Sequence, residues 1–199
     1  MPRVHYVKSA RKDNIAVRKG EPYYWWQNFR SPKRFSKTYP RGSQLCTGRK
    51  SEVMAAQEAL TDDLMMADTA EQIKDACETC AETFRQLASE YEESADNMPE
   101  SLQYGEQAEN MREMAASLET QADELENLDF DPPHELEPRP DRQEPEEDDF
   151  DSEDEFNEAW DDWDFAGSEW DDRNDENESH IEQLKEDAQF ASDEVEFLF

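Results

Sequence analysis

The charged side chains of this chain are separated by sign along the sequence, and this separation limits what the chain can fold into. Residues 1–50 contain 13 Lys or Arg and only 2 Asp or Glu, whereas residues 51–128 contain 3 basic and 21 acidic residues. Residues 129–199 contain 4 basic and 30 acidic residues, and the whole chain has a formal net charge of -33. Segments of one sign repel themselves and attract the other sign, so we expect three parts that serve different contacts.

The composition limits how much of the chain can be packed. Apolar residues make up 35% of the sequence and charged residues 37%, whereas folded domains are usually about 45–50% apolar. The predicted fold class is mainly α, with an N-terminal β-hairpin and basic arm, a helical hairpin or three-helix middle, and a largely disordered acidic C-terminal tail. No stretch approaches the roughly 20 apolar residues of a bilayer-spanning helix, and the N-terminal region lacks the apolar core of a secretory signal, so no membrane partner is expected.

The cationic first part of the chain predicts a basic arm followed by a β-hairpin. Residues 3–19 are rich in Lys and Arg and show no regular periodicity, which is typical of an extended arm. After a turn at residues 20–22, the aromatic run at residues 23–30 favours a strand. A second turn leads into residues 34–39, which alternate as a second strand. One face of that strand is predicted to present Arg34, Ser36 and Thr38, and the other Phe35, Lys37 and Tyr39. One face of the hairpin is therefore predicted to offer cations and the other rings.

Cations and aromatic rings on one small sheet are what a nucleic-acid surface needs. Lys and Arg neutralise phosphates, and exposed rings stack on unpaired bases, which is worth about 1–3 kcal/mol per base. Two alternatives use the same residues: the sheet binds another acidic protein surface, including this chain's own tail, or its rings only form the core of a small sheet. The candidate nucleic-acid-binding residues are Arg18, Lys19, Tyr23, Trp25, Arg30, Lys33, Arg34, Phe35, Lys37, Tyr39 and Arg41.

The middle part of the chain predicts helices. Residues 53–64 have apolar positions at helical spacing, and a longer stripe covers residues 73–95 after a cap at Asp68 or Thr69. Pro99 ends that helix, and a third stripe covers residues 102–128. Two antiparallel helices joined by a short turn would bury these stripes as a solvated bundle. The alternative is self-association as a homo-oligomer, or docking of a partner, because thin helices bury little apolar area by themselves.

The acidic C-terminal part begins with a proline-containing linker and is interrupted by rings. Phe156, Trp160 and Trp163 are spaced i, i+4, i+7 and would share one face if the segment became helical on binding. A last helix is expected over residues 179–199, with apolar positions from Ile181 onward. The rings predict recognition of a partner protein, and docking on the chain's own basic arm is the alternative. The candidate partner-binding residues are Phe156, Trp160, Trp163, Phe165, Trp170, Phe197 and Phe199.

Little in the sequence indicates catalysis or metal binding. Cys77 and Cys80 form a C-x-x-C inside a helical pattern, while Cys46 and the 3 His residues are scattered. Buried thiols on a helix seam are therefore expected in preference to a zinc or redox site, which needs further ligands. Phosphate-loop, dinucleotide and zinc-protease motifs do not occur in the sequence, and the carboxylates are too dense to single out an acid–base pair. We expect no enzyme activity, no metal and no cofactor.

Parts of the sequence resemble a group of phage proteins. The segments MPRVHYVK at residues 1–8, PYYWW at 22–26, KRFSK at 33–37 and DNMPESLQ at 96–103 are similar to uncharacterised proteins of tailed bacteriophages. The resemblance implies a phage-encoded protein in the host cytoplasm and implies no activity. The basic strand pair also resembles the small sheets with which phage integrases grip DNA arms. The acidic end closing on Phe199 is similar in style to the tails of single-stranded-DNA-binding proteins.

The leading hypothesis is a non-enzymatic phage accessory protein that binds nucleic acid through residues 1–50. Its helical middle would position or oligomerise it, and its tail would recruit a protein or mask the basic arm. One rival is an acidic decoy, in which residues 129–199 imitate a DNA backbone and inhibit a host DNA-binding protein, although the prolines and irregular acidic runs count against it. Another is a virion structural or assembly component whose basic arm pairs with an acidic neighbour.

Overall fold

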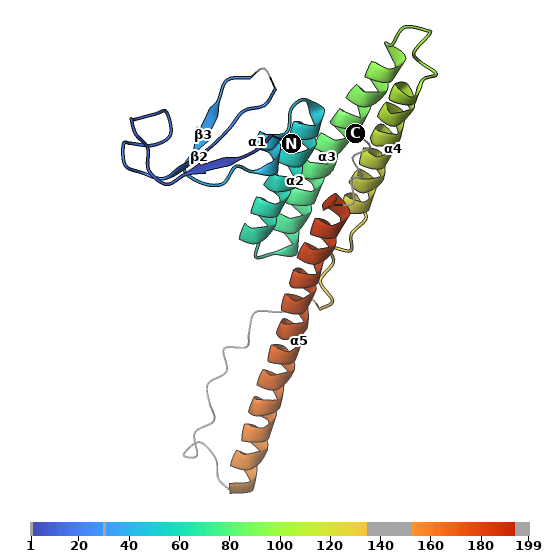
Figure 1. Ribbon diagram of the computed structural model, residues 1–199. Coiled ribbons are helices and arrows are strands. Elements are labelled where there is room, and N and C mark those ends of the chain that lie inside the picture. Colours follow the sequence, from blue (N-terminus) through green and yellow to red (C-terminus); the bar gives the residue numbers. More distant parts are fainter. Residues whose placement is uncertain (1, 30, 135–152, 194–199) are drawn as a thin grey trace.

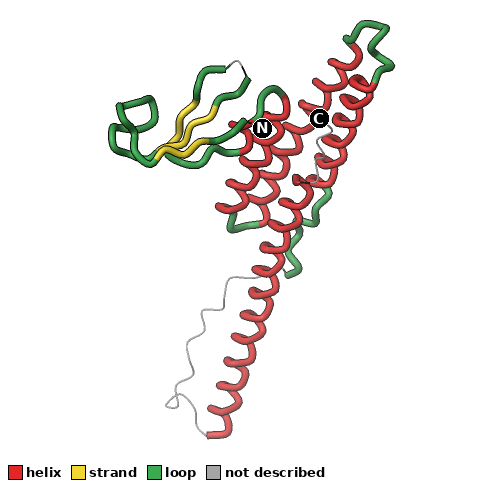
Figure 2. The backbone as a smooth tube through the Cα atoms, viewed as in Figure 1, coloured by secondary structure: helices red, strands yellow, loops and turns green. Residues whose placement is uncertain are grey.

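The computed structural model describes residues 2–29, 31–134 and 153–193, and it is mainly helical, as predicted (Figure 1). A small sheet stands at one side of a helical bundle, and a long helix runs out of the bundle (Figure 1). Figure 2 shows the same division by secondary structure. The elements in chain order are β1 (His5–Val7), β2 (Tyr23–Trp26), β3 (Arg34–Ser36), α1 (Gly42–Leu45), α2 (Arg49–Met66), α3 (Ala70–Asp96), α4 (Glu106–Glu126) and α5 (Glu153–Asp193).

The N-terminal sheet has three antiparallel strands in the order β1-β2-β3, whereas the sequence predicted a two-stranded hairpin. His5 of β1 lies opposite Trp25 of β2, and Trp25 lies opposite Phe35 of β3. The predicted basic arm therefore contains the first strand. The residues of β1 have ring and β-branched side chains, which favour a strand. A strand of three residues within a segment rich in Lys and Arg is too short to be recognised from the sequence. A third strand matters because an isolated hairpin is marginal in water.

The loop between β1 and β2 is also ordered, by short polar side chains that bind its backbone. Asn14 Oδ1 accepts hydrogen bonds from the N–H groups of Ala16 and Val17, both at 2.9 Å. Asp13 Oδ1 accepts from the N–H of Lys19 at 2.6 Å. Asn and Asp stabilise tight turns in this way because their side chains replace a backbone acceptor. The backbone of the loop is thus ordered, and its Lys and Arg side chains are exposed to solvent.

Helix α3 begins and ends where the local signals place it. Thr69 is the N-cap of α3, and its side chain accepts from the N–H of Gln72 at 3.3 Å. Gln72 Oε1 in turn accepts from the N–H of Asp68 at 2.8 Å, which completes a reciprocal cap of the predicted kind. α3 ends at Asp96, just ahead of Pro99, because the residue before a proline disfavours the helical conformation.

The apolar core lies between α2, α3 and α4. Phe84 and Leu118 are completely buried, and they join the two long antiparallel helices. Leu102, which the sequence pattern places on the apolar stripe, is 54% exposed because α4 begins only at Glu106. Among the helices that the structure describes, none is both long and apolar enough to cross a bilayer. The other large buried side chains of this core are Val53, Leu60, Leu64, Ile73, Leu87, Tyr91, Met114 and Leu125.

The C-terminal end of α5 completes the bundle. Leu184, Ala188 and Ala191, at positions predicted from their spacing, are buried in the same core. Polar contacts fix the helix lengthwise: Gln57 Nε2 donates to the carbonyl oxygen of Ser192, and Thr61 Oγ1 lies 2.8 Å from Gln189 Oε1. The middle of the chain therefore forms the three-helix unit that was one of the two predicted arrangements, and the end of α5 packs against it as a fourth helix.

Helix α5 is much longer than predicted, since it begins at Glu153 and the expected last helix began at residue 179. Residues 153–178, which composition assigned to a disordered tail, form its N-terminal part. The last proline of the sequence, Pro145, precedes the helix, and hydrogen bonds one turn apart support the exposed part, such as Arg173 Nη2 to Glu169 Oε1 at 2.6 Å. The acidic linker at residues 135–152 lies outside the described residues.

We expect Phe84→Ala to lower the free energy of unfolding by about 3–5 kcal/mol, because it leaves a cavity between α3 and α4. Urea denaturation followed by far-UV circular dichroism measures the change. Tyr104→Ala is the matched control, since Tyr104 is 91% exposed at the turn between these helices. An equal loss in both variants would contradict the position of the core.

We expect Cys77 and Cys80 to react with a thiol reagent only after unfolding. Burial raises the pKa of both thiols to about 12, so little thiolate is present at pH 8 and reagent access is blocked. Cys46 is only half-buried and serves as the internal control. Titration with Ellman's reagent should give one fast thiol in the folded protein and three in urea. Fast reaction of all three without denaturant would show that the seam is open.

Candidate nucleic-acid interface

One face of the sheet carries a row of aromatic rings, which we call the ring face and define as His5, Tyr23, Trp25 and Phe35. The strand register places His5, Trp25 and Phe35 side by side. The His5 and Trp25 rings are stacked, with centroids 4.2 Å apart and planes 9° apart. The ring centroids of Tyr23 and Phe35 lie 6.0 Å apart. All four rings are half-buried, so each keeps part of its surface in solvent.

Two lysines adjoin the ring face. Lys33 Nζ lies 4.5 Å from the centroid of the Trp25 ring, which is a cation–π contact, and the Lys33 side chain is exposed. Lys37 is also exposed, with its Nζ 3.4 Å from Glu21 Oε2. The hydrogen bond from the N–H of Arg18 and, less strongly, Lys37 hold the pKa of Glu21 below its usual value. Positive charge and aromatic surface are therefore combined on one side of the sheet.

The opposite face also carries rings, so the predicted division into a cationic face and a ring face is wrong. Trp26 is 2% exposed on this side, and its Nε1 donates to the carbonyl oxygen of Gln44 at 3.1 Å. Tyr24 lies between Tyr6 and Tyr39, with centroid distances of 5.1 and 5.5 Å. The reason is that β2 has four consecutive aromatic residues, which alternate between the two faces.

Residues after the sheet anchor it to α2. Arg41 donates two hydrogen bonds to Asp62, at 2.6 and 3.3 Å, and this contact raises the pKa of Arg41. The N–H and hydroxyl of Ser43 donate to the two oxygens of Glu58, at 2.9 and 2.6 Å. Arg41, a candidate for phosphate binding, is therefore engaged at the junction. This pair of contacts fixes the sheet relative to the bundle.

The structure brings together about half of the predicted nucleic-acid-binding residues. Tyr23, Trp25 and Phe35 lie on the ring face, and Lys33 and Lys37 adjoin it. The other candidates lie elsewhere. Arg18 and Lys19 lie in the β1–β2 loop, and Arg34 and Tyr39 lie on the opposite face of the sheet. Arg41 lies at the junction with α2, and Arg30 lies outside the described residues.

His5 belongs to the ring face although the sequence pattern did not single it out. Its strand is only three residues long, and its partner in the register is twenty residues away. The available signal was the ring and β-branched character of residues 5–7. Without knowledge of the strand pairing, that signal does not place His5 against Trp25.

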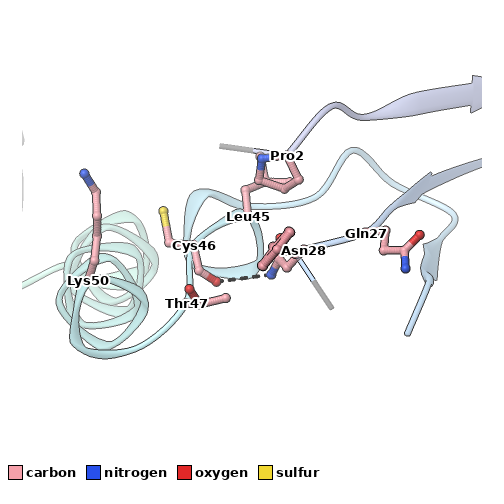
Figure 3. Close-up of a pocket in the computed structure, with 8 residues that line it drawn as sticks. Pro2, Gln27, Asn28, Leu45, Cys46, Thr47 and Lys50 are labelled. Carbon is pink, nitrogen blue, oxygen red and sulfur yellow. Dashed lines mark hydrogen bonds between the residues drawn. The ribbon is translucent and has the colours of Figure 1, made fainter. Parts of the chain in front are cut away.

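A cavity of about 640 Å³ lies at the junction of the sheet and α2 (Figure 3). Asn28 is almost fully buried there and donates through Nδ2 to the carbonyl oxygen of Cys46 at 3.5 Å (Figure 3). Thr47 and Lys50 lie on the side nearest α2. Among the described residues that line the cavity there is no carboxylate and no imidazole. Its titratable side chains are those of Cys46 and Lys50.

The aromatic residues of α5 form a second cluster, far from the sheet. Trp160 lies 6.1 Å from Phe156 and 5.5 Å from Trp163, measured between ring centroids, so the spacing correctly predicted one shared face. Trp170 is half-buried, and Phe165 is 70% exposed. The predicted partner-binding residues at the end of the chain, Phe197 and Phe199, lie outside the described residues.

The thiols of the C-x-x-C are packed within the helical core. Cys77 is fully buried, Cys80 is 3% exposed, and both are reduced. Cys80 Sγ contacts the carbonyl oxygen of Ala56 at 3.9 Å. Within the described part of the chain, no three His, Cys, Asp or Glu side chains are grouped as metal ligands. The two cysteines are thus placed as core residues of α3.

No family model, curated protein or solved structure matches this chain. The similarity to tailed-bacteriophage proteins therefore stays a prediction, as does the host cytoplasm as its location. The geometry of the ring face is the observation from which a function can be inferred.

We expect Glu58→Ala to loosen the junction between the sheet and α2 without unfolding the bundle. Removing the carboxylate leaves the N–H and hydroxyl of Ser43 without their acceptor, which costs about 1–3 kcal/mol locally. Hydrogen exchange should become faster for residues 42–46 and stay unchanged in α3 and α4. Glu71→Ala, at an exposed position of α3, is the control. Unchanged exchange at residues 42–46 would show that this contact does not hold the junction.

Proposed function

We propose that this chain is a non-enzymatic protein that binds single-stranded nucleic acid on the ring face. The observation that carries the proposal is the row of His5, Trp25 and Phe35, held in register on an antiparallel sheet with Lys33 above the Trp25 ring. Unpaired bases stack on such rings whatever their sequence, because every base has a π-face. The neighbouring lysines supply the contacts to phosphate.

The charge distribution supports the same surface. Residues 1–40 contain 10 Lys or Arg against 2 Asp or Glu, and the described cations among them are exposed. A polyanion is attracted to this part and repelled by the acidic helices, so the acidic remainder confines nucleic acid to the sheet. Binding should consequently weaken steeply with salt, as counterions compete for the phosphates.

The rest of the chain fits an accessory role in the proposed phage context. The bundle holds the sheet at a fixed place through Arg41 and Ser43, and α5, which contains Trp160 and Phe165, extends away from the sheet (Figure 1). We place recruitment of a host or phage protein on this second cluster, in the host cytoplasm or on the virion. This arrangement separates the nucleic-acid surface from the protein surface.

A second candidate function is the acidic decoy, and one observation favours it. Residues 153–178 contain 13 Asp or Glu and one basic residue, and they belong to a single uninterrupted helix. A rigid rod of carboxylates is a better imitation of a phosphate backbone than an irregular tail. A pull-down from bacterial lysate with and without nuclease separates the candidates. Nuclease-sensitive capture favours nucleic-acid binding, a retained host DNA-binding protein favours the decoy, and phage structural proteins favour a virion role.

We expect Lys33→Gln with Lys37→Gln to weaken binding of single-stranded DNA for all sequences. Fluorescence anisotropy with a labelled single-stranded oligonucleotide measures the affinity. A length of about 16 nucleotides is enough to cover one binding site of a small domain. Each lost phosphate contact should reduce the slope of log affinity against log salt by about 0.7, so the two together reduce it by about 1.4. An RNA probe of the same sequence measures the preference between DNA and RNA.

The controls separate charge from position. Lys74→Gln with Arg112→Gln removes two cations from α3 and α4 and should leave binding unchanged. Trp25→Leu should weaken binding by about 1–3 kcal/mol, whereas Tyr104→Leu, which removes an exposed ring elsewhere, should not. Circular dichroism checks that each variant is folded. Equal affinity of the Lys33/Lys37 variant and the unaltered protein would reject the proposed function.

A further inference from the structure

The N-terminal part of α5 is an acidic rod, which we define as residues 153–178. It contains 13 Asp or Glu and one basic residue. At 1.5 Å per residue it extends about 38 Å, and it projects beyond the bundle in Figure 1. Asp161, Asp162 and Asp164 are exposed beside Trp160, and Phe165 is 70% exposed. The rod thus offers carboxylates and aromatic surface together.

The rod is fixed in direction where it leaves the bundle. The side chain of Asn177 makes two hydrogen bonds to the backbone of His134. Its Oδ1 accepts from the His134 N–H at 3.1 Å, and its Nδ2 donates to the His134 carbonyl oxygen at 2.9 Å. The His134 ring also contacts the carboxylate of Glu176. Beyond this clamp, Leu184 and Ala188 bury the helix in the core. Swinging the rod would require breaking these contacts together.

The rod and the basic sheet of the same chain lie far apart. Figure 1 shows the sheet beside the upper bundle and the rod extending below the bundle, away from the sheet. The two surfaces are nevertheless complementary, because residues 1–40 contain 10 basic and 2 acidic residues and carry rings on an exposed face. Residues 153–178 of one chain therefore cannot cover its own ring face while α5 stays in the bundle.

We propose that the acidic rod of one copy docks on the basic sheet of a second copy. Opposite charge brings the two together, and rings such as Trp160 and Trp25 supply the apolar contact area. Rod against rod is excluded by like charge. A two-fold pair, in which each copy contributes one sheet and one rod, satisfies both surfaces and closes the assembly. Nucleic acid and the rod would compete for the same sheet, so in the dimer the rod of one copy blocks the ring face of the other.

The test is sedimentation velocity of the full chain without nucleic acid, at low and high salt. Exposed charges are screened when the Debye length falls from about 14 Å to about 4 Å, between roughly 50 mM and 500 mM salt. We expect a dimer at low salt whose apparent dissociation constant rises at least about tenfold at high salt. A monomer at both salt concentrations, or a dimer insensitive to salt, would overturn the proposal.

Two variants and their mixture identify the surfaces. The rod variant is Asp161→Asn, Asp162→Asn and Asp164→Asn, and the sheet variant is Lys33→Glu with Lys37→Glu. Each should be monomeric alone. Mixed, they should form a heterodimer, because the intact sheet of the first meets the intact rod of the second. No heterodimer from folded variants, as judged by circular dichroism, would overturn docking in trans.

A matched control and a competition experiment complete the test. Glu109→Gln, Glu113→Gln and Glu119→Gln remove three exposed carboxylates from α4 and should leave the dimer intact. Loss of the dimer in this control would show that only net charge matters, which overturns the proposal. The inference does not depend on nucleic-acid binding: a salt-sensitive dimer that ignores single-stranded DNA would reject the proposed function alone, and a monomer that binds DNA would reject this inference alone.

Discussion

The apolar contact between α3 and α4 supports the rest of this molecule. Phe84 and Leu118 are fully buried within it, and alanines at neighbouring seam positions let the two helices approach closely. α2 and the end of α5 pack on that pair and extend its core. The sheet is connected to this core through α2, because Arg41 and Ser43 bind α2 and Trp26 of β2 is buried beside the same segment. A chain with so few apolar residues can form one such core, and the structure concentrates them there.

A few cations of the bundle form exposed ion pairs between its acidic helices, which add a small contribution to the apolar contact. Arg85 of α3 donates to Asp123 at 2.8 Å and makes a two-pronged contact with Glu126 of α4. These contacts raise the pKa of Arg85 and lower that of Glu126. A lowered carboxyl pKa stabilises the fold at neutral pH, and this contribution is lost as the pH falls through the folded-state pKa. Arg49 similarly joins α2 to Glu90 and Ser94 of α3.

The fold separates two surfaces that both carry aromatic rings but have opposite charge. The ring face joins aromatic surface to lysines, and the rod joins aromatic surface to carboxylates. In the proposed function the ring face binds bases and phosphates, and in the proposed dimer the rod binds a cationic surface with rings. Because the bundle holds them apart within one chain, contact between them becomes a property of two chains. This separation connects the proposed nucleic-acid binding to the proposed masking.

The sequence by itself determined the mainly helical class, a helix cap at Asp68 or Thr69, the helix end before Pro99 and the shared face of Phe156, Trp160 and Trp163. Each is a local signal, carried by residues within about two turns of one another. Only the tertiary structure decided that residues 5–7 form a strand and that α5 continues through the acidic segment into the core. The same is true of Arg41, which serves the junction. These outcomes depend on partners far away in sequence, such as Trp25 for His5 and Gln57 for Ser192, and composition and periodicity do not record such pairings.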